Sequence, residues 1–231
     1  MPRKGNEPVI TRLEPLRPKG LAMRVHLDRG EPLEVALEAL ERMGLGVGDA
    51  LPPNVRHHLL DADAEARIRE AALGLLSHRA RTRAELRRKL TAKGFRPARV
   101  EPCLDRLEQR GLVDDQAVAA AFVRDRIRHR PRGKARLAQE LRAKGVHDPL
   151  ATAVVDRVME DEALGETQLA TRVVEGWLKR QGPLVRRALA GPHTPEREKA
   201  RRRLHQYLAR RGFAGPAFSE ALELARRLAS R

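Results

Sequence analysis

One ten-residue pattern occurs three times along this chain of 231 residues, and it constrains the fold more than any other feature. The copies read LRRKLTAKGF at residues 86–95, LAQELRAKGV at 137–146 and LHQYLARRGF at 204–213. In each copy two leucines lie four residues apart, on one face of a helix, and a basic residue and a glycine follow. Glycine readily adopts the left-handed conformation that ends many helices, and a cation in the last turn complements the helix dipole. The pattern therefore predicts one kind of helix end three times, at Gly94, Gly145 and Gly212.

The spacing of these glycines indicates a repeat protein. They lie 51 and 67 residues apart, and helical periodicity continues between them. A unit of about fifty residues, made of three short helices, is typical of helical arrays. The extra length before the last copy predicts an insertion around residues 182–194. We expect a mainly α protein whose tandem three-helix repeats form an elongated array.

The N-terminal part has a different periodicity. In LAMRVHLD, at residues 21–28, apolar and polar side chains alternate as they do in a half-buried strand, and Asp28-Arg29-Gly30 supplies a turn before PLEVAL. A short helix is expected at residues 38–43. The expected organisation is a β-rich extension, linking helices and three helical repeats, with boundaries at 1–50, 51–76, 77–114, 115–162 and 163–231.

Local signals place the helix ends of the first two repeats. Thr82 followed by Glu85 forms a capping box, so a helix starts at Arg83. Asp114 or Asp115 caps a later helix, whose core face is expected to hold Val118, Ala121, Phe122 and Ile127. Pro102 predicts a late start or a kink in the helix that follows Pro97.

The residue types argue against an enzyme. GLGVGD lacks the Lys-Ser/Thr of a phosphate loop, no HExxH occurs, and the adjacent His57 and His58 cannot share a helix face as metal ligands. Asp114 and Asp115 are better explained as a cap and a first-turn acid than as a catalytic pair. We therefore expect no catalytic residue, no metal and no cofactor.

Cysteine content and hydropathy indicate the compartment. The single cysteine, Cys103, cannot form a disulfide within one chain and is expected to be a core or boundary thiol. The start of the chain has no apolar signal region, and no run approaches the length of a membrane span. These features predict a cytoplasmic protein that does not enter the membrane.

The net charge of +16 points to a polyanionic partner. The charge is uneven: residues 78–145 carry 20 basic and 8 acidic side chains, residues 146–178 carry 2 and 7, and residues 179–211 carry 11 and 2. A uniformly arginine-rich, soluble surface is the alternative explanation, but it should spread the charge evenly. Aromatic residues are only 3% of the chain, so a base-stacking platform is not expected.

Two segments concentrate this charge. In RTRAELRRKLTAK, the outer face of the helix carries Arg83 and Arg87, with Arg79 or Lys93 beside them; in FVRDRIRHRPRGKARL, five cations flank the break between two helices: Arg124, Arg128, Arg132, Lys134 and Arg136. Solvated helix faces are the structural alternative. Contacts to backbone phosphate, without base reading and strongly weakened by salt, are the preferred interpretation.

Several segments, in order, resemble the RecX family, which regulates the recombinase RecA. They are ALGLLSHRARTRAELRRKLTAKGF, RLEQRGLVDD and AAFVRDRIRHRPRGKARLAQELRAKGV, and the likeness extends to about Glu162. ITRLEPL and MRVHLD resemble the β-extension of some members. The third repeat matches poorly, and AVAAAFV has small residues where members often have a larger one near Ala117 or Val118.

The resemblance implies a curved array of three three-helix repeats without catalysis of its own. It implies binding in the groove of a RecA–DNA filament and inhibition of strand exchange and of ATP hydrolysis by RecA. The implied partners are the RecA filament and the phosphates of single- and double-stranded DNA, bound by a monomer. The candidate RecA- or DNA-binding residues are Arg83, Arg87, Arg88, Lys93, Arg124, Arg128, Arg132, Lys134, Arg136, Arg142 and Lys144.

A second hypothesis is a DNA-binding protein of helix-turn-helix type, with a transcriptional or architectural role, since three-helix units ending in GLVDD also resemble such cores. A sequence-specific reader should carry Asn, Gln, Ser and Arg on one exposed helix. The only asparagines are Asn6 and Asn54, neither on a candidate helix, which favours the RecA regulator.

Overall fold

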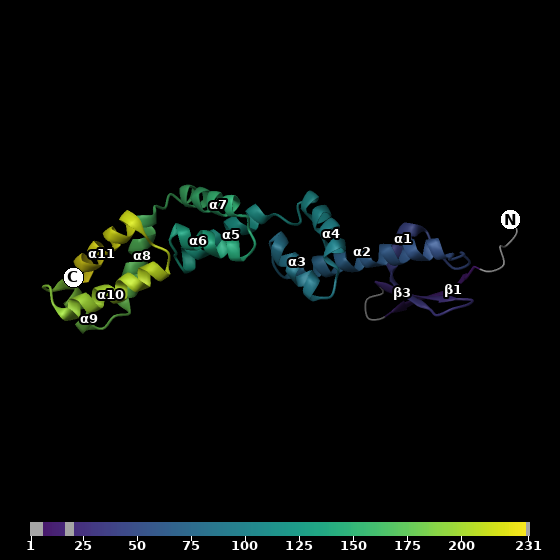
Figure 1. Ribbon diagram of the computed structural model, residues 1–231, viewed down its shortest axis with the longest axis horizontal. Coiled ribbons are helices and arrows are strands. Elements are labelled where there is room, and N and C mark those ends of the chain that lie inside the picture. Colours follow the sequence, from purple (N-terminus) through teal and green to yellow (C-terminus); the bar gives the residue numbers. More distant parts are fainter. Residues whose placement is uncertain (1–6, 17–20, 230–231) are drawn as a thin grey trace. The chain divides into compact units, whose positions relative to one another are not determined.

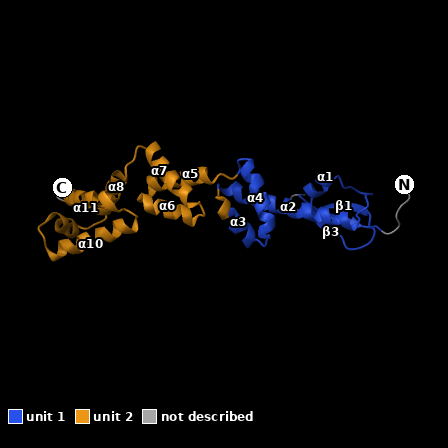
Figure 2. Ribbon diagram, turned by 45° about the horizontal axis from the view of Figure 1, so that its top comes forward, with its two compact units in different colours: residues 1–80, 86–112 blue, residues 81–85, 113–231 orange. Residues whose placement is uncertain are grey.

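A computed structural model describes residues 7–16 and 21–229; residues 1–6, 17–20 and 230–231, including the start of the expected extension, lie outside the described part. The elements are mainly helices, with one small sheet near the N-terminus (Figure 1), so the expected fold class is confirmed. The chain forms two compact units (Figure 2). Unit 1 comprises residues 1–80 and 86–112, and unit 2 comprises residues 81–85 and 113–231.

Unit 1 begins with a three-stranded antiparallel sheet in the order β1-β2-β3, formed by β1 (Ile10–Leu16), β2 (Ala22–Leu27) and β3 (Leu33–Ala36). Leu13 lies opposite Val25, and Met23 lies opposite Val35. Val25 and Val35 are fully buried, with Leu40 of α1 (Leu37–Met43) and Leu59 of α2 (Pro53–His78) in the same core. The alternation in the sequence thus identified the strands because one face of the sheet is covered by helices.

Helix α2 runs without a break from Pro53 to His78, where we expected linking helices. Gly74 is the only glycine within it and no proline follows the first turn, so no local signal ends the helix earlier. Asp63 anchors α2 to the sheet. Its carboxylate accepts hydrogen bonds from the Ala36 N–H at 2.6 Å and from Arg67 Nε at 2.8 Å.

Helices α3 (Arg83–Ala92) and α4 (Pro97–Gln109) follow. Leu86 and Leu90 of α3 are fully buried, as the leucine spacing predicts. Of the late start or kink expected at Pro102, the late start does not occur, because α4 begins at Pro97 and continues through Pro102. Val100, in the turn that precedes Pro102, is fully buried, and its packing holds this turn in the helix. Cys103 is buried on the same helix, as expected.

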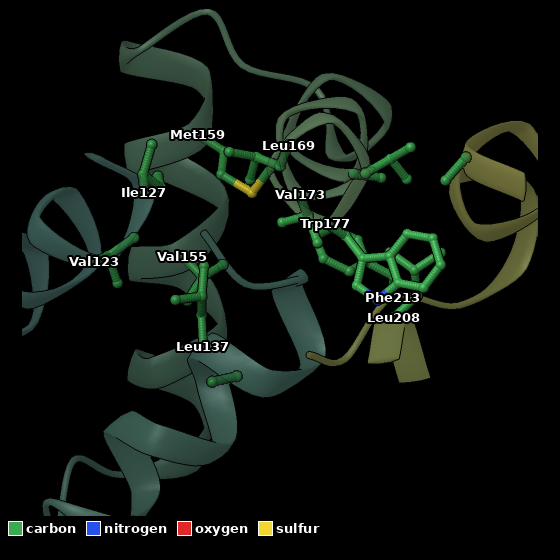
Figure 3. Packing of buried hydrophobic residues seen from close by; sticks show 14 of the residues in the cluster. Val123, Ile127, Leu137, Val155, Met159, Leu169, Val173, Trp177, Leu208 and Phe213 are labelled. Atoms are coloured by element: carbon green, nitrogen blue, oxygen red, sulfur yellow. The ribbon is translucent and has the colours of Figure 1, made fainter. Parts of the chain in front are cut away.

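Unit 2 contains seven more helices among the described residues: α5 (Asp115–His129), α6 (Lys134–Ala143), α7 (Asp148–Asp161), α8 (Glu166–Lys179), α9 (Pro183–Ala190), α10 (Pro195–Arg210) and α11 (Gly215–Ala229). They share one apolar core (Figure 3), in which Val123, Leu137 and Val155 pack on one side and Val173, Trp177 and Phe213 on the other. The short α9 lies within residues 182–194, where the sequence predicts an insertion. Thr194 caps α10, and its hydroxyl accepts a hydrogen bond from the Arg197 N–H.

The core face of α5 differs from the expected one. Ala119, Val123 and Ile127 are buried, whereas Ala121 is exposed. Phe122 is half-buried, because Arg126 and Lys144 lie over its ring, 4.4 and 5.0 Å from the centroid. The small residues of AVAAAFV made several helix faces look equally apolar, so the sequence did not identify the buried one.

The three predicted helix ends are present. Gly94, Gly145 and Gly212 have φ values of 92°, 83° and 81°, in the left-handed region. In each turn the N–H of the next residue donates to a carbonyl five residues earlier: Phe95 to Leu90, Val146 to Leu141 and Phe213 to Leu208. These ends depend on local geometry, which explains why the pattern alone predicted them.

Candidate nucleic-acid interface

The glycine turn of one repeat lies against the first helical turn of the repeat before it, and this junction occurs twice within unit 2. In the first junction, the Thr82 hydroxyl donates to the Lys144 carbonyl at 2.7 Å. In the second, the Gly133 N–H donates to the Arg211 carbonyl at 2.9 Å. Cβ atoms on the turn glycines would overlap Ala84 in the first junction and Arg136 in the second. The glycines are therefore required for close packing as well as for the turn.

Acidic side chains complete the first junction. Asp114 caps its own helix by accepting from the Ala117 N–H, whereas Asp115 accepts from the Arg83 N–H at the start of α3. Glu85 is 5% exposed and lies 3.2 Å from Lys144 Nζ. Both aspartates therefore have the structural role that the sequence predicts. In addition, Asp115 caps a helix of another repeat.

Most candidate cations have an acidic partner inside the molecule. Arg87 pairs with Glu101, and Arg142 lies 2.8 Å from Asp148. Arg83 is half-buried at the start of α3. The remaining paired candidates and their partners are Arg124 with Asp161, Lys134 with Asp156, Lys144 with Glu85, and both Arg132 and Arg136 with Glu140. Because these charges are already balanced, they contribute less attraction to an external anion than their number suggests.

Three candidates are exposed and have no acidic partner among the described residues: Arg88, Lys93 and Arg128. The side chains of such residues can contact a polyanion without breaking an internal ion pair. We call Arg88, Lys93 and Arg128 the unpaired cations. They are the part of the candidate set that is best prepared to bind phosphate.

The break between α5 and α6 collects cations around a single carboxylate. Glu140 accepts from Arg126 Nε at 3.0 Å and from Arg136 Nε at 3.3 Å, and Arg132 Nε lies 3.7 Å from it. Arg132 Nε is buried and has no hydrogen-bond acceptor among the described residues. Burial, followed by the nearby Arg211, lowers the pKa of Arg132. Lys134 points elsewhere, to Asp156, whose hydrogen bond raises the pKa of Lys134.

The structure adds cations that the candidate set does not contain. Arg172, Arg180 and Arg211 line a cavity with Arg132, and Tyr207 lies beside them. The excess charge of residues 179–211 was the available signal for Arg180 and Arg211, but it was not assigned to individual residues because the third repeat matched the family pattern poorly. Arg172 lies in the acidic segment of residues 146–178, so the charge distribution gave no signal for it.

Other kinds of site receive no support from the described residues. No group of three His, Cys, Asp or Glu side chains in this part of the chain could hold a metal ion. A membrane-crossing helix is likewise not found among the described helices, since none is both long and apolar enough.

Comparisons with known proteins connect this geometry to a family. Residues 69–107 match the model of "RecX, first three-helix domain", and residues 114–155 match "RecX, second three-helix domain". "Regulatory protein RecX" of Halorhodospira halophila is 39% identical over 150 residues, which are 65% of this chain and 83% of the relative. The protein of the same name from Prosthecochloris aestuarii is 32% identical over 163 residues, 71% of this chain and 95% of the relative.

Solved structures show the same fold over a longer stretch. One "Crystal structure of regulatory protein RecX" superposes with a TM-score of 0.69 at 25% identity and covers 94% of this chain and 99% of its own. RecX from Lactobacillus salivarius superposes with a TM-score of 0.52 at 19% identity, which supports the fold alone. The likeness therefore includes the third repeat, beyond the reach of the two family models.

Proposed function

Because this chain belongs to the RecX family of regulatory proteins, we propose that it regulates RecA by binding the RecA–DNA filament and inhibiting its ATPase and strand-exchange activities. The observation that carries the DNA part of the proposal is the set of unpaired cations. Arginine and lysine side chains without internal partners gain most from contact with phosphate, and such contact does not depend on base sequence.

The distribution of ion pairs refines the binding residues. Arg124, Lys134, Arg142 and Lys144 join different helices of unit 2 through their acidic partners, and Arg136 pairs with Glu140 one turn later on α6. Replacing them would change both charge and packing, so their variants would not separate binding from folding. The unpaired cations are exposed, and their neutral replacements should leave the fold intact.

The proposal is tested by the ATPase activity of RecA on single-stranded DNA. Wild-type protein should lower this activity at ratios up to one molecule per RecA. The variant with Arg88→Gln, Lys93→Gln and Arg128→Gln should require a higher concentration for the same inhibition. A control variant with Arg12→Gln, Arg56→Gln and Arg227→Gln removes equal charge from exposed positions outside the candidate set.

Two results would oppose the proposal in different ways. If the wild-type protein leaves the ATPase unchanged while binding one DNA sequence far more tightly than others, the helix-turn-helix alternative is favoured. If both triple variants lose inhibition equally, the unpaired cations are not the binding residues and only the total charge matters.

A further inference from the structure

The second repeat junction contains a cavity of about 450 Å³ with an unusually uniform charge. Its walls come from the break between α5 and α6, from α8 and from α10, all within unit 2. No carboxylate of the described residues lines the cavity. Its basic lining residues are one histidine and five arginines: His129, Arg130, Arg132, Arg172, Arg180 and Arg211. A volume of this size is in the range of small-ligand pockets.

The two junctions of unit 2 differ in charge at equivalent positions. By the repeat spacing, Arg136 corresponds to Glu85, and Arg211 corresponds to Lys144. In the first junction Lys144 is neutralised by Glu85 at 3.2 Å. In the second, both positions are arginine, and Glu140 is already shared by three guanidinium groups. The second junction therefore has no carboxylate at the position of Glu85, and its nearby carboxylates are already engaged, Glu140 by these guanidinium groups and Glu166 by the Lys134 N–H at 3.1 Å.

Individual donors are left available by this arrangement. In the described part of the chain no acceptor reaches the buried Arg132 Nε, and such a donor carries a desolvation cost that an accepting oxygen would remove. On α8, Arg172 and Arg180 lie two turns apart on the face that also presents Gly176 to the cavity. Arg172 is exposed and has no acidic partner among the described residues.

Tyr207 orders two of the arginines. Arg211 lies over its ring at 4.5 Å from the centroid, and Arg180 donates to its hydroxyl at 2.6 Å. Guanidinium groups held in this way lose less entropy when they bind an oxyanion, and their planar forks match phosphate oxygens. The cavity is thus partly organised for an anion before one arrives.

We propose that this cavity is a phosphate-binding site that holds the backbone of a nucleic acid strand. This proposal depends on the proposed function only for the role of the site in the cell, because binding of the strand to the cavity does not require RecA. The cavity's cations continue along α10, where Arg203 is exposed one turn before Tyr207. A nucleic acid strand, with one phosphate per nucleotide at regular spacing, matches this row of cations better than the scattered carboxylates of an acidic protein.

The test uses the full-length protein and a fluorescein-labelled oligothymidylate, with affinity measured by anisotropy at constant ionic strength. The variant with Arg172→Gln and Arg180→Gln should bind at least about tenfold more weakly than wild type, because two charge-assisted contacts are lost. The control variant with Arg157→Gln and Lys179→Gln removes the same charge from exposed positions on α7 and α8 outside the cavity and should lose much less. Arg132→Lys keeps the charge but removes the buried donor and should also weaken binding.

A second measurement separates the possible sources of the phosphate. Inorganic phosphate, compared with chloride at equal ionic strength, should raise the Tm of wild type but not that of the Arg172→Gln/Arg180→Gln variant. Stabilisation by phosphate with unchanged oligonucleotide affinity in that variant would mean that the cavity takes a small free anion, and the proposal would be wrong.

Two further outcomes also overturn the proposal while leaving RecA regulation intact. Equal losses in the cavity variant and its control would show that only total charge matters. Unchanged oligonucleotide affinity with reduced binding to RecA filaments would assign the cavity to carboxylates of the protein partner. Circular dichroism spectra and thermal melts of each variant verify that it is folded.

Discussion

The basic residue before each helix-ending glycine has a different environment in each repeat. Lys93 is exposed, Lys144 lies against Glu85 and Phe122, and Arg211 lies over Tyr207. The sequence pattern assigned one role to all three, as partners of the helix dipole. Their further roles depend on residues from other helices. The same position of the repeat is therefore exposed in the first copy, forms an ion pair in the second and lines a cavity in the third.

At the same scale, Gly133 is predicted to be required for packing rather than for backbone freedom. Its φ of −68° is available to any residue, but a Cβ would overlap the Gly212 carbonyl. Gly133→Ala should lower the free energy of unfolding by about 1–3 kcal/mol, as for other overpacked sites. Urea denaturation followed by circular dichroism measures this change.

Gly165 provides the matched control for that substitution. It is also a helix N-cap with an extended backbone, and a Cβ there would meet no atom of the described residues within 4 Å. Gly165→Ala should change the free energy of unfolding by less than about 0.5 kcal/mol. Similar values for the two variants would show that the close approach at Gly133 is not important for stability.

At the scale of the element, Thr82 has two functions where Thr194 has one. Thr82 accepts from the Glu85 N–H and donates to the Lys144 carbonyl, whereas the Thr194 hydroxyl accepts from the Arg197 N–H and donates to no group of the described residues. Thr194→Ala should cost about 1 kcal/mol of unfolding free energy. Thr82→Ala should cost about 1–2 kcal/mol more, because the carbonyl of Lys144 loses its donor. Equal losses in thermal or urea unfolding would contradict the role of Thr82 in the junction.

Helix ends were predictable from the sequence, but the pairing of charges was not. Capping by Thr82, Asp114 and Thr194 and the glycine turns involves residues within one or two turns of each other, so short patterns encode them. The pairs of Lys144 with Glu85 and of Lys134 with Asp156 join residues 59 and 22 positions apart. A pattern on one helix cannot show such partners, which is why the candidate set contained many cations that are already neutralised.

At the scale of the whole molecule, the chain contains 47 lysines and arginines, but fewer cations are available to a partner, because internal ion pairs engage some of them. Binding to nucleic acid should therefore depend on salt less steeply than the total number of basic residues implies. The unpaired cations should make a measurable contribution, since each phosphate contact releases counterions.

Salt dependence tests this contribution. The Arg88→Gln/Lys93→Gln/Arg128→Gln variant should show a plot of log affinity against log salt concentration that is less steep by about 2 for single-stranded DNA, from three lost contacts. Titrations of a labelled oligonucleotide at several salt concentrations provide the slopes. The Arg12→Gln/Arg56→Gln/Arg227→Gln control should keep the wild-type slope, and a matching decrease there would mean that binding does not distinguish these surfaces.

The proposed regulation of RecA is tested most directly by comparing the affinity of the wild-type protein for two targets at the same salt concentration. The targets are a RecA filament assembled on single-stranded DNA and the same DNA without RecA, and co-sedimentation or anisotropy provides both affinities. We predict tighter binding to the filament, in the concentration range that inhibits ATP hydrolysis. Equal or weaker binding to the filament would contradict the proposal and leave a protein that binds DNA alone.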